Sequence, residues 1–362
     1  MAVQETYLAL TATPGRDFRQ EAAEVLRLLH DRLSGRQPVW LRFHLSDVIN
    51  QQPLLDELLA VAHDWLTPDV LRVSVGQAPA NGARVALEAY LVGDDTPVER
   101  RPGMTLLRLA NYTVVCLSAP SLQSRGSGPQ MREEFAAVER ALAPLGGTLA
   151  AHVQRTWIYC RDIDNNYAAL VVARRELFAE RGLTADTHYI ASTGIEGSAA
   201  EPSRLVRMDT LALLGHDPAQ IQYLQAPDHL SPTHVYGVTF ERGTRIVYGD
   251  RSHLYISGTA SIDRDGHIVH PGDVRAQTER LLDNVEALLA DGDARLEHLA
   301  QAVVYLRDPA DAPTVEEVLS RRLSPSTARL MVRGSVCRPG WLVEMDAIAV
   351  TPDGQPSFRD FC

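Results

Sequence analysis

The sequence predicts an α+β protein built from three tandem β-α-β-α-β units, near residues 1–95, 108–217 and 245–353. Two observations carry this prediction. The order strand, helix, strand ending in an aspartate, second helix and two strands recurs three times along the chain. The third unit's "LVEMD" also matches "LVRMD" in the second unit. Polar or proline-rich linkers, "VGDDTPVERRPG" and "GHDPAQIQYLQAPDHLSPTHVYG", separate the units.

The first unit shows the pattern most faintly. We expect "ETYLALTATPG" to begin with a strand and "DFRQEAAEVLRLLHDRL" to be the helix after it. The strand "PVWLRFHLSDV" ends near Ser46-Asp47, and the helix "PLLDELLAVAHDWL" follows. The strands "VLRVSVGQAP" and "ARVALEAYLV" complete the unit, with Ala86 aligned to Glu344 of the third unit.

The middle unit repeats this order more clearly. Its first strand is "YTVVCLSAP", its first helix is "GPQMREEFAAVERALAPLG", and "HVQRTWIYCRDID" is a strand ending at Arg161-Asp162. The helix "YAALVVARRELFAERG" and the strands in "HYIASTGIEG" and "SRLVRMDTLALLG" close the unit. Arg207 takes the place of Glu344 here.

The third unit has the strongest helical signal. Its long helix begins near Asp273 and carries apolar residues at helical spacing. They are Val274, Leu281, Leu282, Val285, Leu288 and Leu289. The next strand ends in Arg307-Asp308, and the helix "APTVEEVLSRRL" follows. The segment "ARLMVRGSVCRPGWLVEMDAIAV" reads as two strands joined by a Pro-Gly turn.

A carboxylate, Glu344, stands inside the last apolar strand, "WLVEMDAIAV". An ionised carboxylate in such surroundings is unfavourable unless it is paired, and burial tends to keep it protonated. Two interpretations are open from these residues. Glu344 is either a functional acid or a bulge or sheet-edge residue whose tip reaches water.

Composition narrows the class of protein. The net charge of −11 argues against a nucleic-acid-binding surface. No apolar run reaches membrane-spanning length, and no basic segment precedes an apolar core at the N-terminus, so we expect a cytoplasmic protein without a membrane anchor. The four cysteines are far apart and form no zinc-binding spacing, which favours a reducing compartment and no metal: Cys116, Cys160, Cys337 and Cys362.

The third unit resembles the RidA/YjgF superfamily. The resemblance lies in "ARLMVRGSVCRPGWLVEMDAIAV", where Arg329 and Glu344 fall on the family's arginine and glutamate. Family members are usually homotrimers with sites in the clefts between subunits. The resemblance therefore implies three RidA/YjgF-like (chorismate-mutase-like) units forming an intramolecular pseudo-trimer, monomeric in solution. Only the cleft that uses the third unit's last strand would keep the glutamate.

The whole chain is more specifically similar to the chorismatases, which remove pyruvate from chorismate. The residues that carry this similarity are "YGVTFERGTRIVYGDRSHLYISGTASID", "RGSVCRPGWLVEMDAIAV", "RTWIYCRDI" and "ASTGIEG". Gly249 and Cys337 match the branch that makes 3-hydroxybenzoate rather than a dihydrodiol. The resemblance implies Glu344, Cys337 and Gly249 as catalytic positions and no metal or organic cofactor.

Chorismate is a dianion, so its site needs two cationic groups, and planar arginine suits carboxylates. The candidates are Arg329, Arg338, Arg242 and Arg161. The pair Arg161-Asp162 could instead only close a strand. Tyr223, Tyr236 and Tyr248 have hydroxyls that could bind a carboxylate, and we favour Tyr248 because it adjoins Gly249.

The expected chemistry is protonation of the enol-ether methylene carbon by Glu344, which requires a raised pKa. Intramolecular attack by the neighbouring ring hydroxyl would then give an arene-oxide-like ring and 3-hydroxybenzoate. Three alternatives remain open: a hydrolase that gives a dihydrodiol, a dual 3-/4-hydroxybenzoate synthase, and a RidA-like imine deaminase. A fourth reading is a binding protein of the same fold without catalysis.

Overall fold

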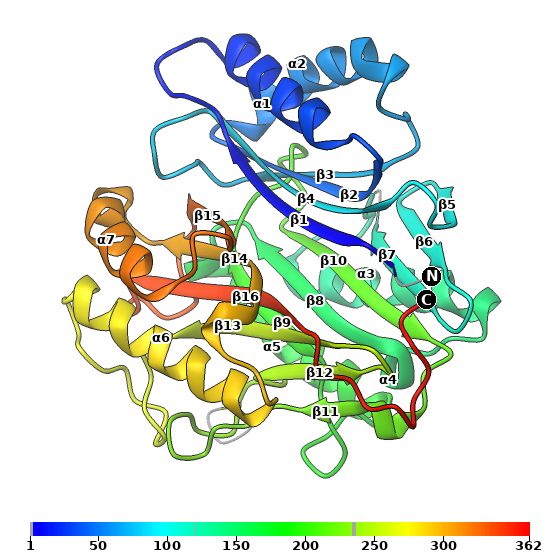
Figure 1. Cartoon of the computed structure of the whole chain (residues 1–362). Helices are drawn as coiled ribbons and strands as arrows, with labels where there is room; N and C mark the ends of the chain where they lie inside the picture. Colours follow the sequence, from blue (N-terminus) through cyan, green and yellow to red (C-terminus); the bar gives the residue numbers. More distant parts are fainter. Residues whose placement is uncertain (1–2, 120, 234–236) are drawn as a thin grey trace.

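The computed structural model describes residues 3–119, 121–233 and 237–362, and they form three sheets, one for each predicted unit (Figure 1). The first sheet has the strand order β1-β4-β2-β3: β1 (Glu5–Thr11), β4 (Val85–Gly93), β2 (Arg36–Leu45) and β3 (Leu71–Gly76). The second has the order β5-β6-β7-β10-β8-β9: β5 (Val98–Arg101), β6 (Met104–Arg108), β7 (Thr113–Ser118), β10 (Val206–Leu214), β8 (Val153–Cys160) and β9 (Ala191–Glu196). The third has the order β11-β12-β13-β16-β14-β15: β11 (Ile221–Tyr223), β12 (Gly243–Val247), β13 (Ser252–Ala260), β16 (Val343–Thr351), β14 (Leu299–Leu306) and β15 (Ala328–Arg333).

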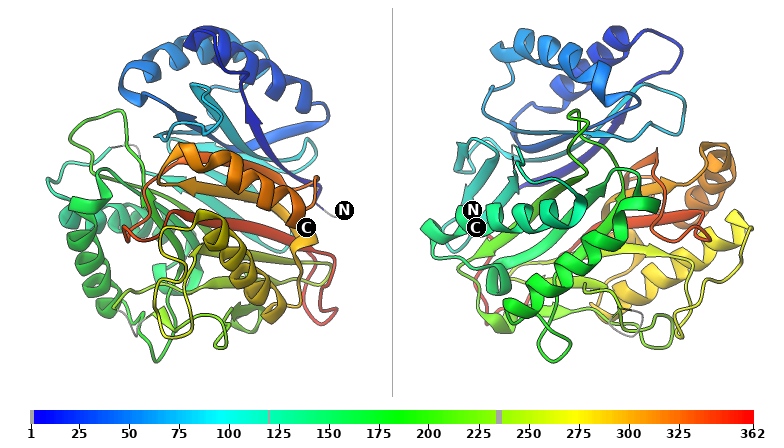
Figure 2. Two further views of the ribbon diagram at one scale, coloured as in Figure 1. Left: turned by 90° about the vertical axis from the view of Figure 1, so that its left-hand side faces the viewer. Right: turned by 180° about the vertical axis from the view of Figure 1, so that it is seen from behind.

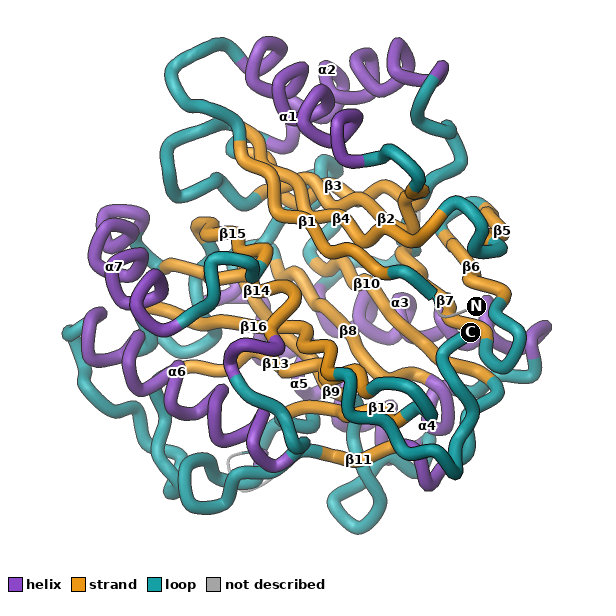
Figure 3. Tube along the Cα trace, viewed as in Figure 1, coloured by secondary structure: helices purple, strands orange, loops and turns teal. Residues whose placement is uncertain are grey.

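The helices lie on the outer faces of the sheets, and the sheets face one another across the centre (Figures 2 and 3). They are α1 (Phe18–Arg32) and α2 (Val48–Val61) on the first sheet, α3 (Ser127–Leu142), α4 (Leu149–His152) and α5 (Ile163–Glu180) on the second, and α6 (Val274–Asp291) and α7 (Ala312–Arg322) on the third. This arrangement confirms the predicted α+β pseudo-trimer. In the part of the chain with described structure, no helix is both long and apolar enough to span a membrane.

The pairing of strands confirms how the three units align. Glu344 of β16 lies opposite Tyr305, and Arg207 of β10 lies opposite Tyr159. Ala86 of β4 lies opposite His44 in the same way. Each of these three partner residues lies three residues before the aspartate that follows its strand. The three positions are therefore structurally equivalent, as the "LVEMD" and "LVRMD" match predicts.

The aspartates that end the strands begin the helices. Asp47 accepts the backbone N–H of Asn50 through its side chain and caps α2. Asp308 likewise accepts the N–H of Ala310 before α7. These bonds satisfy backbone donors that a helix start leaves free, which explains why an aspartate recurs at this point. Asp162 precedes α5 with a left-handed backbone and binds the Asn165 side chain instead.

Main-chain bridges join the units into a closed ring. The end of β3 bonds the loop after β9, since Gly76 N–H donates to Ser198 O at 2.7 Å. The end of β9 bonds the loop after β15 in the same manner, from Glu196 N–H to Ser335 O at 3.1 Å. The end of β15 bonds the loop after β3, from Arg333 N–H to the carbonyl of residue 78 at 2.7 Å. Each parallel edge strand therefore borders the next unit around the ring.

Three equivalent carboxylates meet at the centre of this ring. Glu88, Asp209 and Asp346 each lie two residues beyond the aligned positions Ala86, Arg207 and Glu344, and all three are buried.

Two buried arginines compensate these carboxylates. Arg42 of β2 contacts Glu88 at 3.2 Å and Asp209 at 2.9 Å, so it joins the first two units. Arg155 of β8 lies 3.4 Å from Asp346 and joins the second unit to the third. The carboxylates of Glu88 and Asp209 hold the pKa of Arg42 well above its usual range despite burial, so its charge is fixed.

The two predicted linkers contain structure that the sequence interpretation missed. The hairpin β5-β6 forms within and just after "VGDDTPVERRPG" and extends the second sheet, and β11 forms within the longer linker. The last two strands are also not a hairpin, because β14 lies between β15 and β16. The unit boundaries 1–95, 108–217 and 245–353 stay predictions.

We predict that Arg42→Met will strongly destabilise the protein. The change removes the cation shared by Glu88 and Asp209 and leaves buried charge unpaired, which typically costs about 3–5 kcal/mol. Urea unfolding would measure the loss. Arg27→Met is the matched control, because Arg27 forms an exposed pair with Asp31 that is worth at most about 0.5 kcal/mol. A loss for Arg42→Met as small as that of the control would show that the central network is dispensable.

Candidate active site

A cavity of about 370 Å³ lies between the second and third units and contains Glu344. The second unit contributes α5 and β9 to its wall, and the third contributes β13, β16 and the segments 237–242 and 337–341. Side chains that line it are Tyr167, Val171, Arg174, Ser192, Phe240, Arg242, Ile262, Cys337, Arg338, Trp341 and Glu344. We call it the Glu344 cavity.

Glu344 is an acid that stays protonated at neutral pH. Its side chain is 5% exposed, and burial raises the pKa of the carboxyl to about 8. The nearby Asp346 raises this pKa further, while Arg155 and Arg242 lower it. Desolvation therefore outweighs the arginines, a balance that could not be read from the sequence. Among the described residues, none donates a hydrogen bond to this carboxyl.

A glycine, which has no side chain, lies beside the Glu344 carboxyl. Gly258 lies in β13 at a bulge between Ile256 and Thr259. A Cβ atom at this position would collide with Glu344 Oε1 and crowd Thr193. The glycine therefore leaves the space that the Glu344 carboxyl occupies beside β13 in the wall of the cavity.

Asp346 connects the acid to the central network. Its Oδ2 accepts hydrogen bonds from Thr193 Oγ1 at 2.8 Å and from Tyr305 OH at 2.9 Å. Arg155 lies 3.4 Å from the same oxygen and also bonds Thr193. Because Asp346 is anchored from β9 and β14, its charge sits at a fixed place beneath Glu344, where it helps to keep that carboxyl neutral.

Three arginines line the cavity around the acid. Arg242 donates to Ser231 O at 2.9 Å and lies over the Phe240 ring, 5.5 Å from its centre. Arg338 donates to Gly266 O at 3.2 Å and lies 4.9 Å over the Trp341 ring. Arg174 of α5 is the third. The cavity thus combines a neutral acid with a cationic wall suited to an anionic ligand.

Cys337 is a neutral thiol at the boundary between the units. Burial and the neighbouring Glu344 raise its pKa to about 12, so it is not a thiolate nucleophile at physiological pH. It forms a hydrogen bond with the hydroxyl of Tyr167 from α5. The pair closes one side of the Glu344 cavity.

Comparison with known proteins identifies the family. The family model "Endoribonuclease L-PSP" matches residues 245–351. A RutC family protein of Pyrococcus abyssi is 33% identical over 97 residues, which are 26% of this chain and 76% of that protein. This chain belongs to the RutC family, the RidA/YjgF superfamily. The 3-aminoacrylate deaminase RutC of Acinetobacter baylyi is 29% identical over 26% of this chain and 77% of its own length.

The family relationship covers the third unit, but a second comparison covers the whole chain. The crystal structure of a chorismatase superposes with a TM-score of 0.69 and 21% sequence identity. The match spans 96% of this chain and 99% of that one. The complete three-unit fold is therefore the chorismatase fold, as the sequence resemblance implied.

The predicted site residues divide into two groups. Glu344, Cys337, Arg338 and Arg242 come together in the Glu344 cavity. Arg329, Arg161, Gly249 and Tyr248 lie elsewhere. Tyr223 stacks on His188 outside this cavity, and Tyr236 lies outside the described residues.

Arg329 lies one cleft away from Glu344 and forms an ion pair with Glu316. The prediction that Arg329 and Glu344 lie in one cleft considered only the third unit and not its neighbours in the ring. In the ring, a cleft takes its parallel edge strand from one unit and its acid-bearing strand from the next. The strand facing Glu344 is β9, on which Ser192 is the equivalent of Arg329, because Ser192 lies opposite Thr156 and Arg329 opposite Ala302.

Gly249 and Tyr248 belong to the region where the C-terminal segment docks. Gly249 N–H donates to Arg359 O at 2.8 Å, and a Cβ atom there would collide with Asp360. The ring of Tyr248 is buried, with its centre 4.8 Å from that of Phe361. The glycine that adjoins the acid is Gly258, nine residues further along the chain than Gly249.

Arg161 closes a loop, as the second interpretation of Arg161-Asp162 allowed. Its Nη2 donates to Ala199 O and its Nε to Arg204 O. Sequence reasoning missed Tyr167 and Arg174, which approach Glu344 from the second unit. The sequence alone could not indicate these two residues, because they reach the cavity only through the order of the units in the ring. That order places α5 beside the third unit.

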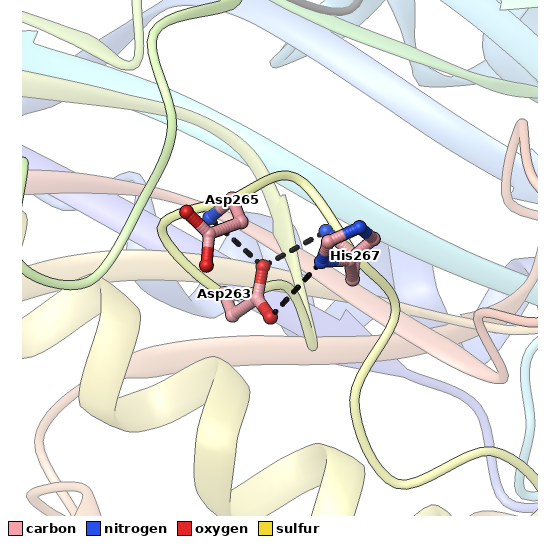
Figure 4. A group of neighbouring side chains, drawn as sticks. All are labelled: Asp263, Asp265 and His267. Carbon is pink, nitrogen blue, oxygen red and sulfur yellow. Dashed lines mark hydrogen bonds and ion pairs between the residues drawn. The ribbon is translucent and has the colours of Figure 1, made fainter.

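The described residues contain one group of three potential metal ligands, Asp263, Asp265 and His267 (Figure 4). Asp263 Oδ1 already accepts the backbone N–H groups of Asp265 at 2.9 Å and His267 at 2.8 Å. These bonds shape the turn whose Gly266 carbonyl accepts from Arg338. Through this turn, Asp263 helps to position Arg338 of the cavity.

We predict that Glu344→Gln will stabilise the protein in a pH-dependent way. The folded carboxyl has a pKa of about 8 against a usual value of 4.5. The folded state therefore holds a proton that the unfolded chain releases, and stability falls as pH rises from about 4.5 to 8. Each pKa unit is worth about 1.4 kcal/mol. The gain in melting temperature for the variant should be larger at pH 8.5 than at pH 4.5.

Glu316→Gln serves as the control, because Glu316 lies on the surface. Its effect on the melting temperature should change little over the same interval. If the gain for Glu344→Gln were equal at the two pH values, Glu344 would not be held protonated.

Proposed function

We propose that this chain converts chorismate and releases pyruvate. The observation that carries the proposal is a buried carboxyl with a pKa of about 8 in a cavity lined by three arginines. The fold shared with a chorismatase crystal structure over nearly the whole chain supports it. Chorismate has two carboxylates and an enol ether that needs a proton, and both requirements have a matching group here.

The cavity suits a ligand of this kind. Its volume of about 370 Å³ is typical of small-molecule sites. Arg338 and Arg242 approach from the third unit and Arg174 from the second, so a dianion can bind arginines on both sides of the cleft. Trp341, Ile262 and Phe240 supply apolar surface for a ring between them.

Glu344 acts as a general acid in this proposal. Its proton goes to the methylene carbon of the enolpyruvyl group, and the bond between the ether oxygen and the ring breaks. The neighbouring ring hydroxyl attacks the same ring carbon, pyruvate leaves, and the hydroxyl proton passes to the Glu344 carboxylate. The arene-oxide-like ring then opens to a hydroxybenzoate. Atoms balance without added water, and Glu344 is protonated again.

The finer proposal is that the product is 3-hydroxybenzoate. Glu344 is the only carboxylate among the described residues that line the cavity, and no histidine lines it there. The thiol of Cys337 is neutral and bonded to Tyr167. The described lining residues therefore include no second base to activate water, which supports intramolecular attack. Gly249 lies beside Asp360 and not beside the acid, whereas Gly258 adjoins Glu344.

Deamination of an imine or enamine is the second candidate. Its support is membership of the RutC family and the match to a 3-aminoacrylate deaminase. The placement of Arg329 weakens this candidate, since the family arginine and Glu344 lie in different clefts. Ammonia release from 2-aminoacrylate with no pyruvate release from chorismate would favour deamination.

We also propose that the protein works as a cytoplasmic monomer without a metal or organic cofactor and without a nucleic-acid partner. The clefts that separate subunits in a homotrimer are internal to this ring, so assembly is not needed to complete the Glu344 cavity.

We predict that Glu344→Gln will lower pyruvate release from chorismate by about 10²–10⁴-fold, as expected for a lost general acid. In the wild type, the rate should fall as pH rises through about 8, because the carboxyl loses its proton. Gly258→Ala should also reduce turnover, since the new methyl group displaces the acid. Glu316→Gln is the control. Pyruvate release by Glu344→Gln at the wild-type rate would refute the role.

Two arginine variants test which of the two clefts binds chorismate. Arg338→Ala should raise the KM for chorismate by roughly tenfold or more, because a charge-assisted hydrogen bond is worth about 1.5–3 kcal/mol. Arg329→Ala removes a similar side chain from the neighbouring cleft and should leave KM and kcat near wild type. The opposite pattern in steady-state kinetics would place the substrate beside Arg329.

Turnover in heavy-oxygen water tests the product. We predict 3-hydroxybenzoate whose ring hydroxyl carries no solvent oxygen, because the oxygen comes from the substrate's own hydroxyl. Mass spectrometry would read the label. Solvent oxygen in the ring hydroxyl would contradict intramolecular attack, and a dihydrodiol would identify a hydrolase. A mixture with 4-hydroxybenzoate would identify a dual-product enzyme.

A further inference from the structure

A second cavity, of about 660 Å³, lies between the first and second units. It takes Phe43 from β2, Leu59 from α2 and Arg72 from β3 of the first unit. The hairpin β5-β6 contributes Arg100, and β10 contributes Arg207. We call it the Arg207 cavity.

The Arg207 cavity is the structural equivalent of the Glu344 cavity. Arg207 and Glu344 occupy equivalent positions on β10 and β16. The edge strands of the two cavities, β3 and β9, also correspond. Arg72 of β3 pairs with Leu41, and Ser192 of β9 pairs with Thr156 at the equivalent position of its unit.

The outer wall of the two cavities corresponds as well. Leu59 of α2 matches Arg174 of α5, since each follows the aspartate before its helix by the same number of residues. The loops that bridge to the edge strands give two more matches. Counted from the bridged carbonyls at residues 198 and 335, Ala200 corresponds to Cys337, and Glu201 corresponds to Arg338. All of these residues line their respective cavities.

The charges are exchanged between the two cavities. Where the Glu344 cavity has a carboxyl at its base, the Arg207 cavity has a guanidinium. The rim of the Arg207 cavity carries exposed groups of both charges: the carboxylates Asp56, Asp69 and Glu201, and the arginines Arg72 and Arg101. Such a cavity cannot protonate a substrate through an acid at its base, but its base can bind an anion.

Two arginines at the base keep hydrogen-bonding capacity for a ligand. The Nε atoms of Arg207 and Arg100 are buried, and neither has a hydrogen-bond partner among the described residues. The nearest bond of Arg207 runs from Nη2 to Ser118 Oγ at 3.4 Å, which is long. No carboxylate in the described ranges lies within 4.0 Å of the Arg207 guanidinium. A buried cation with spare donors is stabilised when an anion binds.

The third cleft of the ring has an apolar residue at the equivalent position. Its equivalent of Glu344 is Ala86, which is fully buried in the apolar core. The facing residues Ala80 and Met331 pack against the same core and are joined by a backbone bond of 2.9 Å. The Arg207 cavity has not been filled in this way.

We propose that the Arg207 cavity binds a small organic monocarboxylate with a ring or other apolar body. Arg207 and Arg100 bind the carboxylate, and Phe43, Leu59 and Leu71 contact the body. Asp56, Asp69 and Glu201 outnumber Arg72 and Arg101 at the rim and oppose ligands with several negative charges, which favours a monocarboxylate over phosphate. The proposal does not depend on chorismate being the substrate of the Glu344 cavity.

Benzoate is the probe, titrated by calorimetry into the full-length protein. Arg338→Ala serves as the background, because it weakens anion binding in the Glu344 cavity. One saturable site should remain. Adding Arg207→Gln should weaken it by about tenfold to a hundredfold, the value of one or two charge-assisted hydrogen bonds. Adding Arg27→Gln, on a distant exposed helix face, should leave the affinity unchanged.

Arg72→Glu provides a second variant in case Arg207→Gln does not fold, because Arg72 is exposed at the rim. It should also weaken benzoate binding. Absence of saturable benzoate binding in the background protein, or an affinity indifferent to both arginine variants, would overturn the proposal. Tighter binding of inorganic phosphate than of benzoate would overturn the choice of a monocarboxylate. Loss of chorismate turnover alone would not affect this test.

Discussion

The ion-pair network at the centre of the ring is the interaction on which the rest of the structure depends. Glu88, Asp209 and Asp346 occupy the same strand position in the three units, which brings them together at the centre. Buried carboxylates so near to one another are unfavourable unless cations neutralise them. Arg42 and Arg155 supply these cations. Because each arginine belongs to one unit and contacts a carboxylate of another, the same contacts neutralise the centre and fix the order of the units.

The network also contributes to the raised pKa of Glu344, for which burial is the larger cause. Asp346 is held by Thr193 from the second unit and Tyr305 from its own. Its charge lies two residues from the acid and helps to raise the pKa of Glu344, while Arg155 limits this effect. A carboxylate at the interface between units thereby adds to the effect of burial on the pKa of Glu344. The apolar strand around Glu344 could be recognised in the sequence, but the strength of these opposing charges depends on distances that only the folded ring defines.

Much of the fold could be predicted because it is local and repeated. The apolar spacing of α6, the aspartate that caps α2 and the aspartate that precedes α7 each lie within a single unit, and the repeat aligns Glu344 with Arg207. The errors arose between units. Arg329 was assigned to the cleft of Glu344 because the sequence does not state which neighbour a strand faces. Gly249 was named from a family match, and the sequence does not show that Gly258 is the glycine beside the acid.

The closed ring of bridges between units has a consequence for how such a protein can change. In three identical subunits, any substitution appears in every cleft at once. Here each cleft is built from two different stretches of one gene, so a mutation alters a single cleft and leaves the other two untouched. An acid can be kept at Glu344 while its counterparts become an arginine at residue 207 and an alanine at residue 86. Duplication within one chain thus releases symmetric sites to diverge separately under selection.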